Sequence, residues 1–234
     1  VWKRWHDTLC RGSTLTLKKN GNIDFNKITK ELKYLKTHEV QIGFFGDRDG
    51  HLLTIVRANE YGAKIVAHNK SGKLWIPSRE AIKRYGKSVT AKDVANKLGK
   101  KFFVAGSKKV DGKKVLGKSA GVIENGKYVV LFYLLDHVRI PARPFLRKAF
   151  YDNQHKYRRL VKVGIDEIVY DGKTGHDLLV KLGKTGVSDV RESIVRWTKP
   201  GNAPLTIDNK RGTNNPLVDT GSLIKHVTYK IVRL

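Results

Sequence analysis

Residues 139–150 read R-I-P-A-R-P-F-L-R-K-A-F, and this stretch decides how the chain folds on either side of it. Ile140 and Arg143 each precede a proline, and a residue in that position is pushed towards extended backbone. Pro144 suits the first turn of a helix, because the N–H that it lacks has no intrahelical acceptor there. The stretch therefore predicts a rigid corner at which a strand ends and a helix begins.

After the corner, apolar residues recur at steps of three and four, which is typical of an amphipathic helix. This spacing predicts a long helix over 144–171 and shorter helices over 177–182 and 187–197. Residues 205–216 lack such a period and are predicted to form an exposed loop. Apolar and polar residues alternate over 224–232, which favours a last strand.

Before the corner, a first helix is predicted over 25–36, with Asp24 as its N-cap. Four apolar residues at helical spacing form its predicted buried stripe: Phe25, Ile28, Leu32 and Leu35. A half-buried strand is expected at 40–44. A second helix is expected over 52–61, ending at Gly62 in the usual C-cap position.

Residues 70–118 hold 15 Lys+Arg against 3 Asp+Glu, nearly half of the positive excess of the chain. We predict a basic, β-rich insertion over 70–139 rather than a separate domain. Its expected elements are strands at 74–77, 101–105 and 113–116 and short helices at 78–85 and 91–98. Asn125-Gly126 between apolar runs is a strong hairpin signal. The apolar run 128–135 favours a central strand covered on both faces.

Together these patterns predict an α+β fold, in which a mixed, mainly antiparallel sheet packs against a long helix. We expect residues 1–21 to form a basic arm and residues 22–234 to form a single domain that carries the insertion. Trp2 and Trp5 are large apolar side chains, so the arm is expected to pack either on a neighbouring subunit or on its own domain.

The composition bounds the class of protein. The chain has 234 residues, of which 40% are hydrophobic, and this is enough for a folded core. Its net charge of +26 exceeds what solubility needs and favours proximity to nucleic acid or to acidic partners. Cys10 is the one cysteine, so we expect no internal disulfide and no Cys-rich zinc site. A membrane segment and a signal peptide are not expected either.

Asp219-Thr220-Gly221 is the sharpest local match to catalysis and is similar to the active-site turn of aspartic proteases. That chemistry needs two carboxylates that share a proton, so one such turn per chain requires a homodimer. The segment after Ser222 is shorter than the protease fold needs. We therefore expect Asp219 to cap a short turn or helix, and we expect no enzymatic activity.

Three weaker motifs lack residues that their chemistry requires. Gly172-Lys173-Thr174 and Gly183-Lys184-Thr185 resemble the end of a phosphate loop, but both lack its first glycine and are predicted to end helices. Asp47 and Asp49 suggest a calcium loop without its glycine and glutamate. The eight histidines show no metal-ligand spacing. No catalytic residue, metal site or cofactor is therefore expected.

The basic insertion is the remaining candidate for binding. Six of its lysines are candidate contacts with DNA or with a partner protein: Lys100, Lys101, Lys108, Lys109, Lys113 and Lys114. The aromatic residues interleaved with its lysines are Trp75, Tyr85, Phe102 and Phe103. Basic charge with aromatic rings suits single-stranded nucleic acid. The alternative is that these rings fill the core of a sheet whose lysines face water.

Three strings occur in one order along the chain: Ala58-Asn59-Glu60-Tyr61-Gly62-Ala63, Ile140-Pro141-Ala142-Arg143-Pro144-Phe145-Leu146-Arg147 and Pro216-Leu217-Val218-Asp219-Thr220-Gly221-Ser222-Leu223. Together they resemble the phage virion morphogenesis family of tail-completion or neck proteins, including its Mu-like type, over residues 22–234. The basic arm and the lysine content of the insertion depart from the family pattern. The resemblance gives a structural role to Glu60, Tyr61, Gly62, Pro141, Arg143, Pro144, Phe145, Arg147, Asp219, Thr220 and Gly221.

The resemblance implies a structural virion protein, not an enzyme, that completes the tail or joins head and tail as a ring around the DNA passage. It implies a homo-oligomer, with a hexamer as the expected ring, beside head-connector and tail-terminator or tail-tube proteins. Non-specific contact with packaged DNA is also expected. The expected location is the virion, and the host cytoplasm during assembly.

Two alternatives stay open at this point. Arg143 and Arg147 are expected to pair with Glu60 or Asp219 in the same subunit or, alternatively, with acids of a neighbour. The alternative function is a soluble nucleic-acid-binding protein that uses the basic insertion, because counterion release makes any strongly basic surface bind nucleic acid.

Overall fold

The computed structural model describes residues 24–45, 50–110, 113–115, 117–210 and 214–234. Its contacts divide the chain into two compact units. Unit 1 takes in the described residues up to Glu60 together with Pro144–Thr198 and Thr220–Leu234, and unit 2 takes in Tyr61–Arg143 and Lys199–Asp219. Helices and antiparallel sheets occur together, so the predicted α+β class is confirmed. The single domain over 22–234 stays a prediction, and the predicted arm and the 47–49 loop lie outside the described residues.

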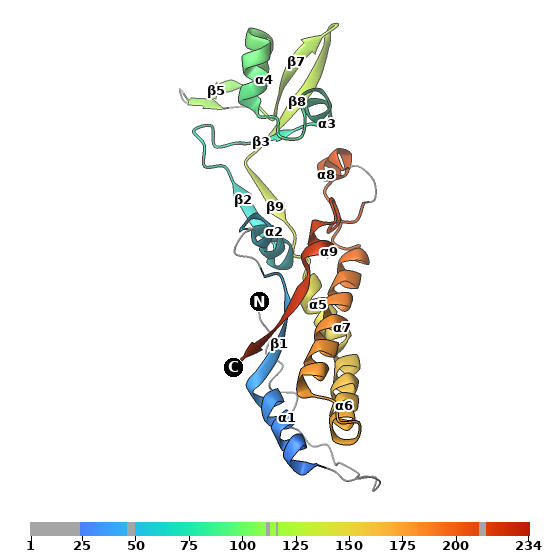
Figure 1. Ribbon diagram of the computed structural model, residues 1–234. Helices are drawn as coiled ribbons and strands as arrows, with labels where there is room; N and C mark the ends of the chain where they lie inside the picture. The colour runs from blue at the N-terminus through green and yellow to red at the C-terminus, as the bar shows by residue number, and fades with distance from the viewer. Residues whose placement is uncertain (1–23, 46–49, 111–112, 116, 211–213) are drawn as a thin grey trace. The chain divides into compact units, whose positions relative to one another are not determined.

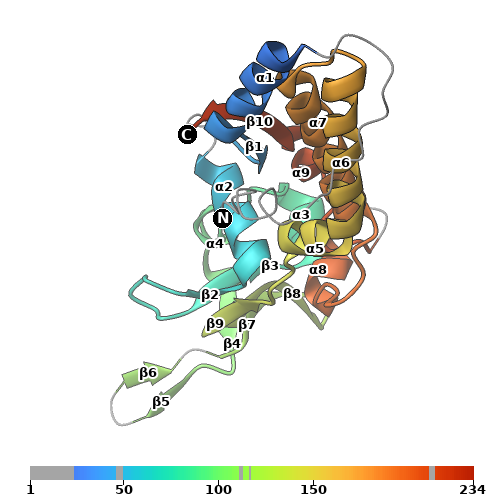
Figure 2. The same ribbon diagram turned by 90° about the horizontal axis from the view of Figure 1, so that it is seen from below.

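Unit 1 contains a two-stranded sheet and the longest of the described helices (Figure 1). Its elements are α1 (Phe25–Thr37), β1 (His38–Gly43), α2 (Gly50–Tyr61), α5 (Phe145–Asp152), α6 (Gln154–Tyr170), α7 (Gly175–Val195), α9 (Ser222–His226) and β10 (Thr228–Arg233). β1 and β10 pair antiparallel, from His38 opposite Arg233 to Gly43 opposite Thr228. α7 packs on both strands, as Figure 2 shows, so the predicted packing of a sheet against a long helix is present in this unit.

Two glycines allow α7 to approach the sheet closely. A Cβ at Gly183 would lie 2.3 Å from the ring of Tyr229, and a Cβ at Gly186 would lie 2.2 Å from Cδ1 of Ile42. Both glycines lie inside α7, which continues from Gly175 to Val195. The prediction that Gly183-Lys184-Thr185 ends a helix is wrong. The two helices predicted over 177–182 and 187–197 are one continuous helix, because the glycines between them serve close packing on the sheet and do not break the helix.

The core of unit 1 lies between α1, β1, α6 and α7. Its buried side chains are Leu35, Val40, Tyr157, Ile168, Leu178, Leu179 and Leu182. Asp24 caps α1 as predicted, since its carboxylate accepts from the N–H groups of Asn26 and Lys27. The buried stripe of α1 is narrower than predicted. Leu35 is buried, but Phe25 is 69% exposed and Leu32 is 43% exposed.

Three further predictions in this unit are corrected. The helix predicted over 144–171 is broken at Asn153, whose side chain donates back to the carbonyl of Ala149. Such local bonds compete with the helix ladder. The last strand begins at Thr228, because residues 222–226 form the short helix α9. Gly172-Lys173-Thr174 does end a helix as predicted, and Thr174 then caps α7.

Unit 2 is rich in short strands. Its elements are β2 (Ala63–Val66), β3 (Leu74–Pro77), α3 (Arg79–Tyr85), α4 (Ala91–Leu98), the 3-10 helix η2 (Gly99–Lys101), β4 (Phe103–Ala105), β5 (Lys108–Val110), β6 (Lys113–Val115), β7 (Ser119–Glu124), β8 (Lys127–Leu135), β9 (His137–Ile140) and α8 (Pro204–Asn209). The main sheet has the antiparallel order β3-β8-β7-β4, while β2 pairs with β9 and β5 with β6. α8 lies where the sequence predicted only loop.

The predicted hairpin is formed by β7 and β8. Asn125 and Gly126 both have positive φ, 49° and 74°, as a tight hairpin turn with the natural strand twist requires. β8 is central, as predicted, but it is not covered on both faces, since Tyr133 and Leu135 are 38% and 37% exposed. The pairing of β7 with β8 has a register shift between Ala120 and Gly121, and this shift accounts for the unbroken apolar run of β8.

The shift is a β-bulge in which Leu131 is the extra residue of β8. Val130 lies opposite Gly121, and Phe132 lies opposite Ala120. A bulge moves the following side chains to the other face of the sheet. Leu131 and Phe132 can therefore both be buried against α3 and α4, although they are adjacent in sequence.

Candidate functional site

The three family-like strings lie where the chain passes from one unit to the other. These crossings fall between Glu60 and Tyr61, between Arg143 and Pro144, and between Asp219 and Thr220. A fourth crossing, between Thr198 and Lys199, precedes the cis peptide bond at Pro200. On each side of the strand-to-helix corner, one arginine is held by its own unit.

In unit 1, Glu60 is the centre of the arrangement, and its side chain is 1% exposed. Its Oε2 accepts from the N–H of Leu146 at 3.0 Å, and its Oε1 accepts from the N–H of Arg147 at 3.2 Å and from Nε of Arg147 at 3.0 Å. Arg147 also donates through Nη2 to the carbonyl of Glu60 at 2.7 Å. The predicted pairing of Arg147 with Glu60 is therefore confirmed.

Glu60 also acts as the cap of α5. Pro144 stands at the N-cap position of that helix without a side-chain capping bond, so the first N–H groups need another acceptor. A carboxylate next to a helix N-terminus is stabilised by those N–H groups and by the helix dipole. Phe145 is fully buried against the edge of Phe44, and its carbonyl accepts from Oγ of Ser193 at 2.9 Å. The start of α5 is thus held from three elements of unit 1.

In unit 2, Arg143 is 6% exposed and binds backbone oxygens. Its Nε donates to the carbonyl of Pro200 at 3.0 Å, and its Nη2 donates to the carbonyl of Gly201 at 2.8 Å. Both acceptors are carbonyls, rather than the acids that the sequence predicted. Burial lowers the pKa of the Arg143 guanidinium. Arg143 thereby ties the chain before the corner to the turn that contains the cis proline.

Gly62 is the other tight point of unit 2. Its φ is +77°, as the predicted C-cap position requires, and a Cβ there would lie 3.0 Å from the carbonyl oxygen of Ile140. Ala63 pairs with Ile140 in the ribbon β2–β9. The strings 58–63 and 140–147 are therefore paired through their backbones at Ala63 and Ile140, directly before Pro141. Tyr61, between these points, is 48% exposed.

The third string behaves differently from the prediction. Asp219 and Thr220 are exposed, and Gly221, with φ +75°, holds the N-cap position of α9 without any side-chain capping bond. The predicted capping role of Asp219 is therefore wrong. Its neighbourhood is instead held by Lys210, whose Nζ donates to the carbonyls of Asn215 at 2.6 Å and Val218 at 2.8 Å. Burial lowers the pKa of Lys210, and the charge of Asp219 acts against that shift.

The six candidate lysines lie on three elements of unit 2. Lys100 and Lys101 are exposed at the end of η2. Lys108 and Lys109 belong to β5, and Lys113 and Lys114 belong to β6, with Lys109 opposite Lys114. The β5–β6 hairpin thus gathers four of them between β4 and β7 in the chain.

The aromatic residues of the insertion separate into two groups. Trp75, Tyr85 and Phe102 pack on the core under α3 and α4, and the rings of Trp75 and Phe102 lie 6.2 Å and 6.0 Å from that of Phe132. For these three residues the core interpretation is confirmed. Phe103 is 38% exposed on the opposite face, where Tyr128 and Tyr133 also lie. Sequence reasoning missed both tyrosines, because it treated 128–135 as a strand without a bulge.

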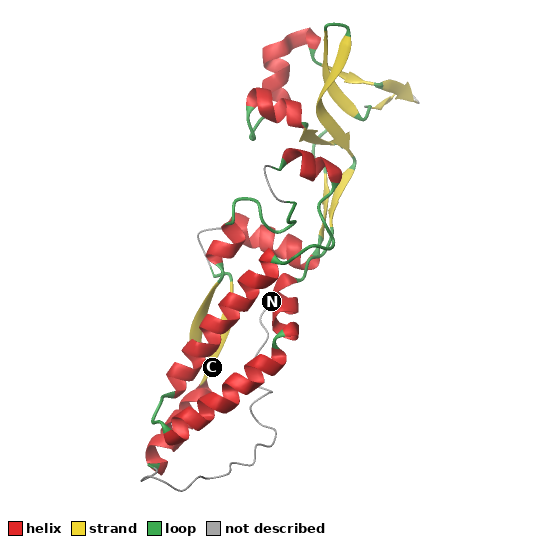
Figure 3. Ribbon diagram, turned by 90° about the vertical axis from the view of Figure 1, so that its right-hand side faces the viewer, coloured by secondary structure: helices red, strands yellow, loops and turns green. Residues whose placement is uncertain are grey.

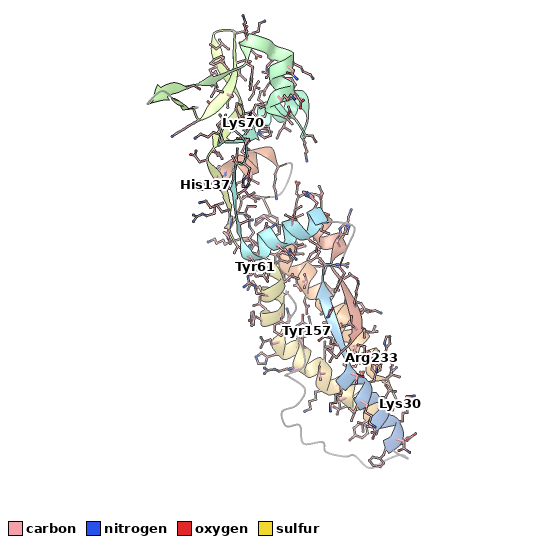
Figure 4. All side chains as sticks on the ribbon, turned by 90° about the vertical axis from the view of Figure 1, so that its left-hand side faces the viewer. Lys30, Tyr61, Lys70, His137, Tyr157 and Arg233 are labelled. Carbon is pink, nitrogen blue, oxygen red and sulfur yellow. The ribbon has the colours of Figure 1, made fainter. Side chains whose placement is uncertain are left out.

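A buried cluster in unit 1 was also missed. Asp189, in the middle of α7, is 3% exposed and accepts from Nζ of Lys156. Burial, together with a hydrogen bond to Asp189, raises the pKa of Tyr157 on α6 (Figure 4). The signal in the sequence was an acid on the apolar side of a helix, where a charge requires a partner. The cluster joins α6 to α7.

Within the described residues, no three His, Cys, Asp or Glu side chains are grouped so that they could hold a metal ion. None of the described helices is long and apolar enough to cross a membrane. A scan against protein-family models and searches of curated proteins and of solved structures find no match to this chain.

Proposed function

We propose that the protein is a structural virion protein of a tailed phage, which completes the tail or joins head and tail as a ring around the DNA passage. The observation that carries the proposal is the bonding of Glu60, from the first family-like string, to Leu146 and Arg147 of the second. Residues that resemble a family motif and bond to one another act as a joint of the scaffold. A scaffold role, rather than catalysis, accounts for the burial of Glu60.

The anchoring of Arg143 supports the same proposal. Its bonds to Pro200 and Gly201 hold the strand side of the corner, as Glu60 holds the helix side. Subunits that repeat around an axis must present the same surfaces to each other, so firm anchoring of the motif residues inside each unit favours a repeating interface. The resemblance implies a hexamer next to head-connector and tail proteins.

The net charge of +26 supports a place near DNA. A ring around the DNA passage brings each subunit close to phosphates, and basic residues there release counterions on contact. Such contact is independent of DNA sequence.

Native mass spectrometry of the purified full chain, combined with immunogold electron microscopy of the phage particles, tests the proposal. We expect a closed oligomer at high protein concentration and gold label at the head–tail connection or at the tail end. A chain that stays monomeric at every concentration and is absent from particles contradicts the proposal.

The matched variant is Asp219→Asn. Asp219 is exposed, so the substitution is expected to leave the oligomer mass unchanged. The dimeric aspartic-protease alternative predicts that the same substitution abolishes peptide hydrolysis, because that chemistry needs the carboxylate. A peptide-hydrolysis activity that is present in the wild-type chain and lost in Asp219→Asn would establish the protease instead.

A further inference from the structure

The four-stranded sheet of unit 2 has one face without a covering element among the described residues. α3 and α4 pack on the other face, as Figure 3 shows beside the β7–β8 hairpin. The side chains that the strand register places on the uncovered side are here called the bare sheet face. Its large apolar members on β4, β7 and β8 are Phe103, Ile123, Tyr128, Val130, Tyr133 and Leu135. Ile123 is 61% exposed, and the three rings are 37–38% exposed.

The bulge in β8 brings the two tyrosines to the same face. Tyr128 and Tyr133 are five residues apart, and in a regular strand an odd separation places side chains on opposite faces. Because Leu131 is the extra residue, Tyr128 lies opposite Ile123 and Tyr133 lies opposite Ser119 on the bare sheet face. The bulge interrupts the regular hydrogen-bond ladder between β7 and β8, and it places the ring of Tyr133 on the same exposed face as that of Tyr128.

Two of the three rings on this face, those of Phe103 and Tyr128, are held by neighbours. The centroids of Phe103 and Tyr128 are 5.6 Å apart, with their planes inclined by 42°. The hydroxyl of Tyr128 lies 3.3 Å from Oγ of Ser119, within hydrogen-bond distance. Rings that are fixed on a sheet and open to solvent are the surfaces on which unpaired bases stack.

The stretch of chain that carries this face has a large excess of positive charge, which suits a polyanion. Residues 61–143 hold 19 Lys+Arg against 5 Asp+Glu. Glu124, at the end of β7, already pairs with Arg84 at 2.7 Å, and Asp136, after β8, already pairs with Lys73 at 2.5 Å. Those pairings lower the pKa of both acids, so each acid is engaged with a cation of its own unit. A second copy that met this face with its own bare sheet face would bring the same positive charge, which disfavours that particular contact between copies.

We propose that the bare sheet face binds single-stranded nucleic acid. Bases stack on Phe103, Tyr128 and Tyr133, and lysines of the basic insertion contact the phosphates. Four of these lysines are on the β5–β6 hairpin, which leaves the sheet after β4 and returns to it at β7. The proposal does not depend on ring assembly, because it concerns a surface within unit 2.

Fluorescence anisotropy tests the proposal with the purified full chain and a labelled oligothymidylate of about 20 nucleotides, longer than the ~4–16 nucleotides that a single-strand-binding fold covers. Tyr128→Ala and Tyr133→Ala are each expected to weaken binding roughly 10-fold, since base stacking on a ring has about that effect. The slope of binding against salt is expected to stay the same, because no phosphate contact is removed.

Three controls separate stacking from charge and from misfolding. Tyr128→Phe and Tyr133→Phe keep the rings and are expected to bind like the wild-type chain. Tyr151→Ala removes an exposed tyrosine of unit 1 and is expected to have no effect. A Lys109→Ser/Lys114→Ser chain is expected to weaken binding to single-stranded and duplex DNA alike and to reduce the salt slope. Circular dichroism checks that each variant is folded.

Three results overturn the proposal. Equal binding by the wild-type, Tyr128→Ala and Tyr133→Ala chains shows that only the basic charge binds. Absence of oligothymidylate binding even at low salt excludes single-stranded nucleic acid as the ligand of this face. Dimerisation that is lost in Ile123→Ser shows that a second copy covers the face. None of these results bears on the gold label at the particle, so failure here is distinct from failure of the proposed function.

Discussion

The two units of this protein differ in how helices cover their sheets. Unit 1 lays its two-stranded sheet against α7 and closes its core with α1 and α6. Unit 2 covers one face of a larger sheet with two short helices, and the other face stays exposed among the described residues. Exposed apolar side chains occur in both units, but the bare sheet face belongs to the unit whose residues 70–118 carry 15 Lys+Arg against 3 Asp+Glu. A surface with both features is more informative than charge alone.

The two corner arginines show the same contrast on a smaller scale. Arg147 in unit 1 binds a buried carboxylate, which also caps α5, whereas Arg143 in unit 2 binds two carbonyls. Loss of Arg143 removes a donor from the carbonyls of Pro200 and Gly201. Loss of the Glu60 side chain, by contrast, leaves two backbone N–H groups and the Nε–H of Arg147 without the carboxylate that accepts from them. We therefore expect the helix side of the corner to be more sensitive to substitution than the strand side.

The strongest test of the contrast between the two sheet faces is a pair of adjacent residues on β8. Phe132→Ala is expected to destabilise unit 2 by roughly 4 kcal/mol, because it empties a position that is 1% exposed. Tyr133→Ala is expected to cost about 0.5 kcal/mol or less, because Tyr133 is on the bare sheet face. Urea unfolding followed by circular dichroism measures both. Similar losses for the two variants would contradict the placement of Tyr133 on the exposed face of the sheet.

Removal of the central carboxylate of the corner comes next in size. Glu60→Ala is expected to lower the free energy of unfolding by roughly 3 kcal/mol, since charge-assisted hydrogen bonds to a buried acceptor are lost together. The matched control is Glu192→Ala, which removes an exposed acid paired with Arg196 one helical turn away. It is expected to cost well under about 1 kcal/mol. Denaturant midpoints compare the two, and equal shifts would show that Glu60 is dispensable.

The capping boxes allow a like-for-like comparison of the units. Thr174 caps α7 in unit 1 and Thr90 caps α4 in unit 2, each with an aspartate three residues later. Thr174→Ala and Thr90→Ala are each expected to cost about 1 kcal/mol. Differential scanning calorimetry measures them. If the units unfold separately, each substitution shifts only the transition of its own unit, and a common shift indicates one cooperative block.

The smallest expected effect on stability concerns Tyr157, and it occurs only in alkaline solution. Its pKa in the folded chain is raised from the ordinary value of 10.0, by burial and by its hydrogen bond to Asp189. Above pH 10 the unfolded chain therefore loses a proton that the folded chain keeps, so stability falls as pH rises. Urea unfolding from pH 8 to 11 is expected to show a shallower decline for Tyr157→Phe. An identical decline in both chains would contradict the raised pKa.

Much of the local structure could be predicted from sequence. The turn at Asn125-Gly126, the N-cap at Asp24 and the helix end at Gly62 all occur as predicted, because each depends on residues within a few positions. The strand 74–77 and the helix 91–98 have their predicted bounds for the same reason. The predictions that failed needed information from elsewhere in the chain.

The candidate sites illustrate that limit. Glu60 is 86 residues before Leu146, so no local pattern shows that it caps α5. The stretch Gly183-Lys184-Thr185 was predicted to end a helix, and only the closeness of Tyr229 to Gly183 and of Ile42 to Gly186 explains why a continuous helix has glycine at both positions. The capping role assigned to Asp219 failed, because the backbone of Gly221 starts α9 without it.

Composition and short-range pattern were sufficient for the α+β class, for the strand-to-helix corner at Pro144 and for the strong positive charge. These properties depend on backbone preferences and formal charges that each residue carries with it. The bulge at Leu131, the face on which Tyr133 lies and the acceptors of Arg143 and Arg147 were decided only by the tertiary structure. Each of these depends on which distant strand or helix is adjacent, and packing sets that by excluding water from one face and supplying partners for buried polar groups.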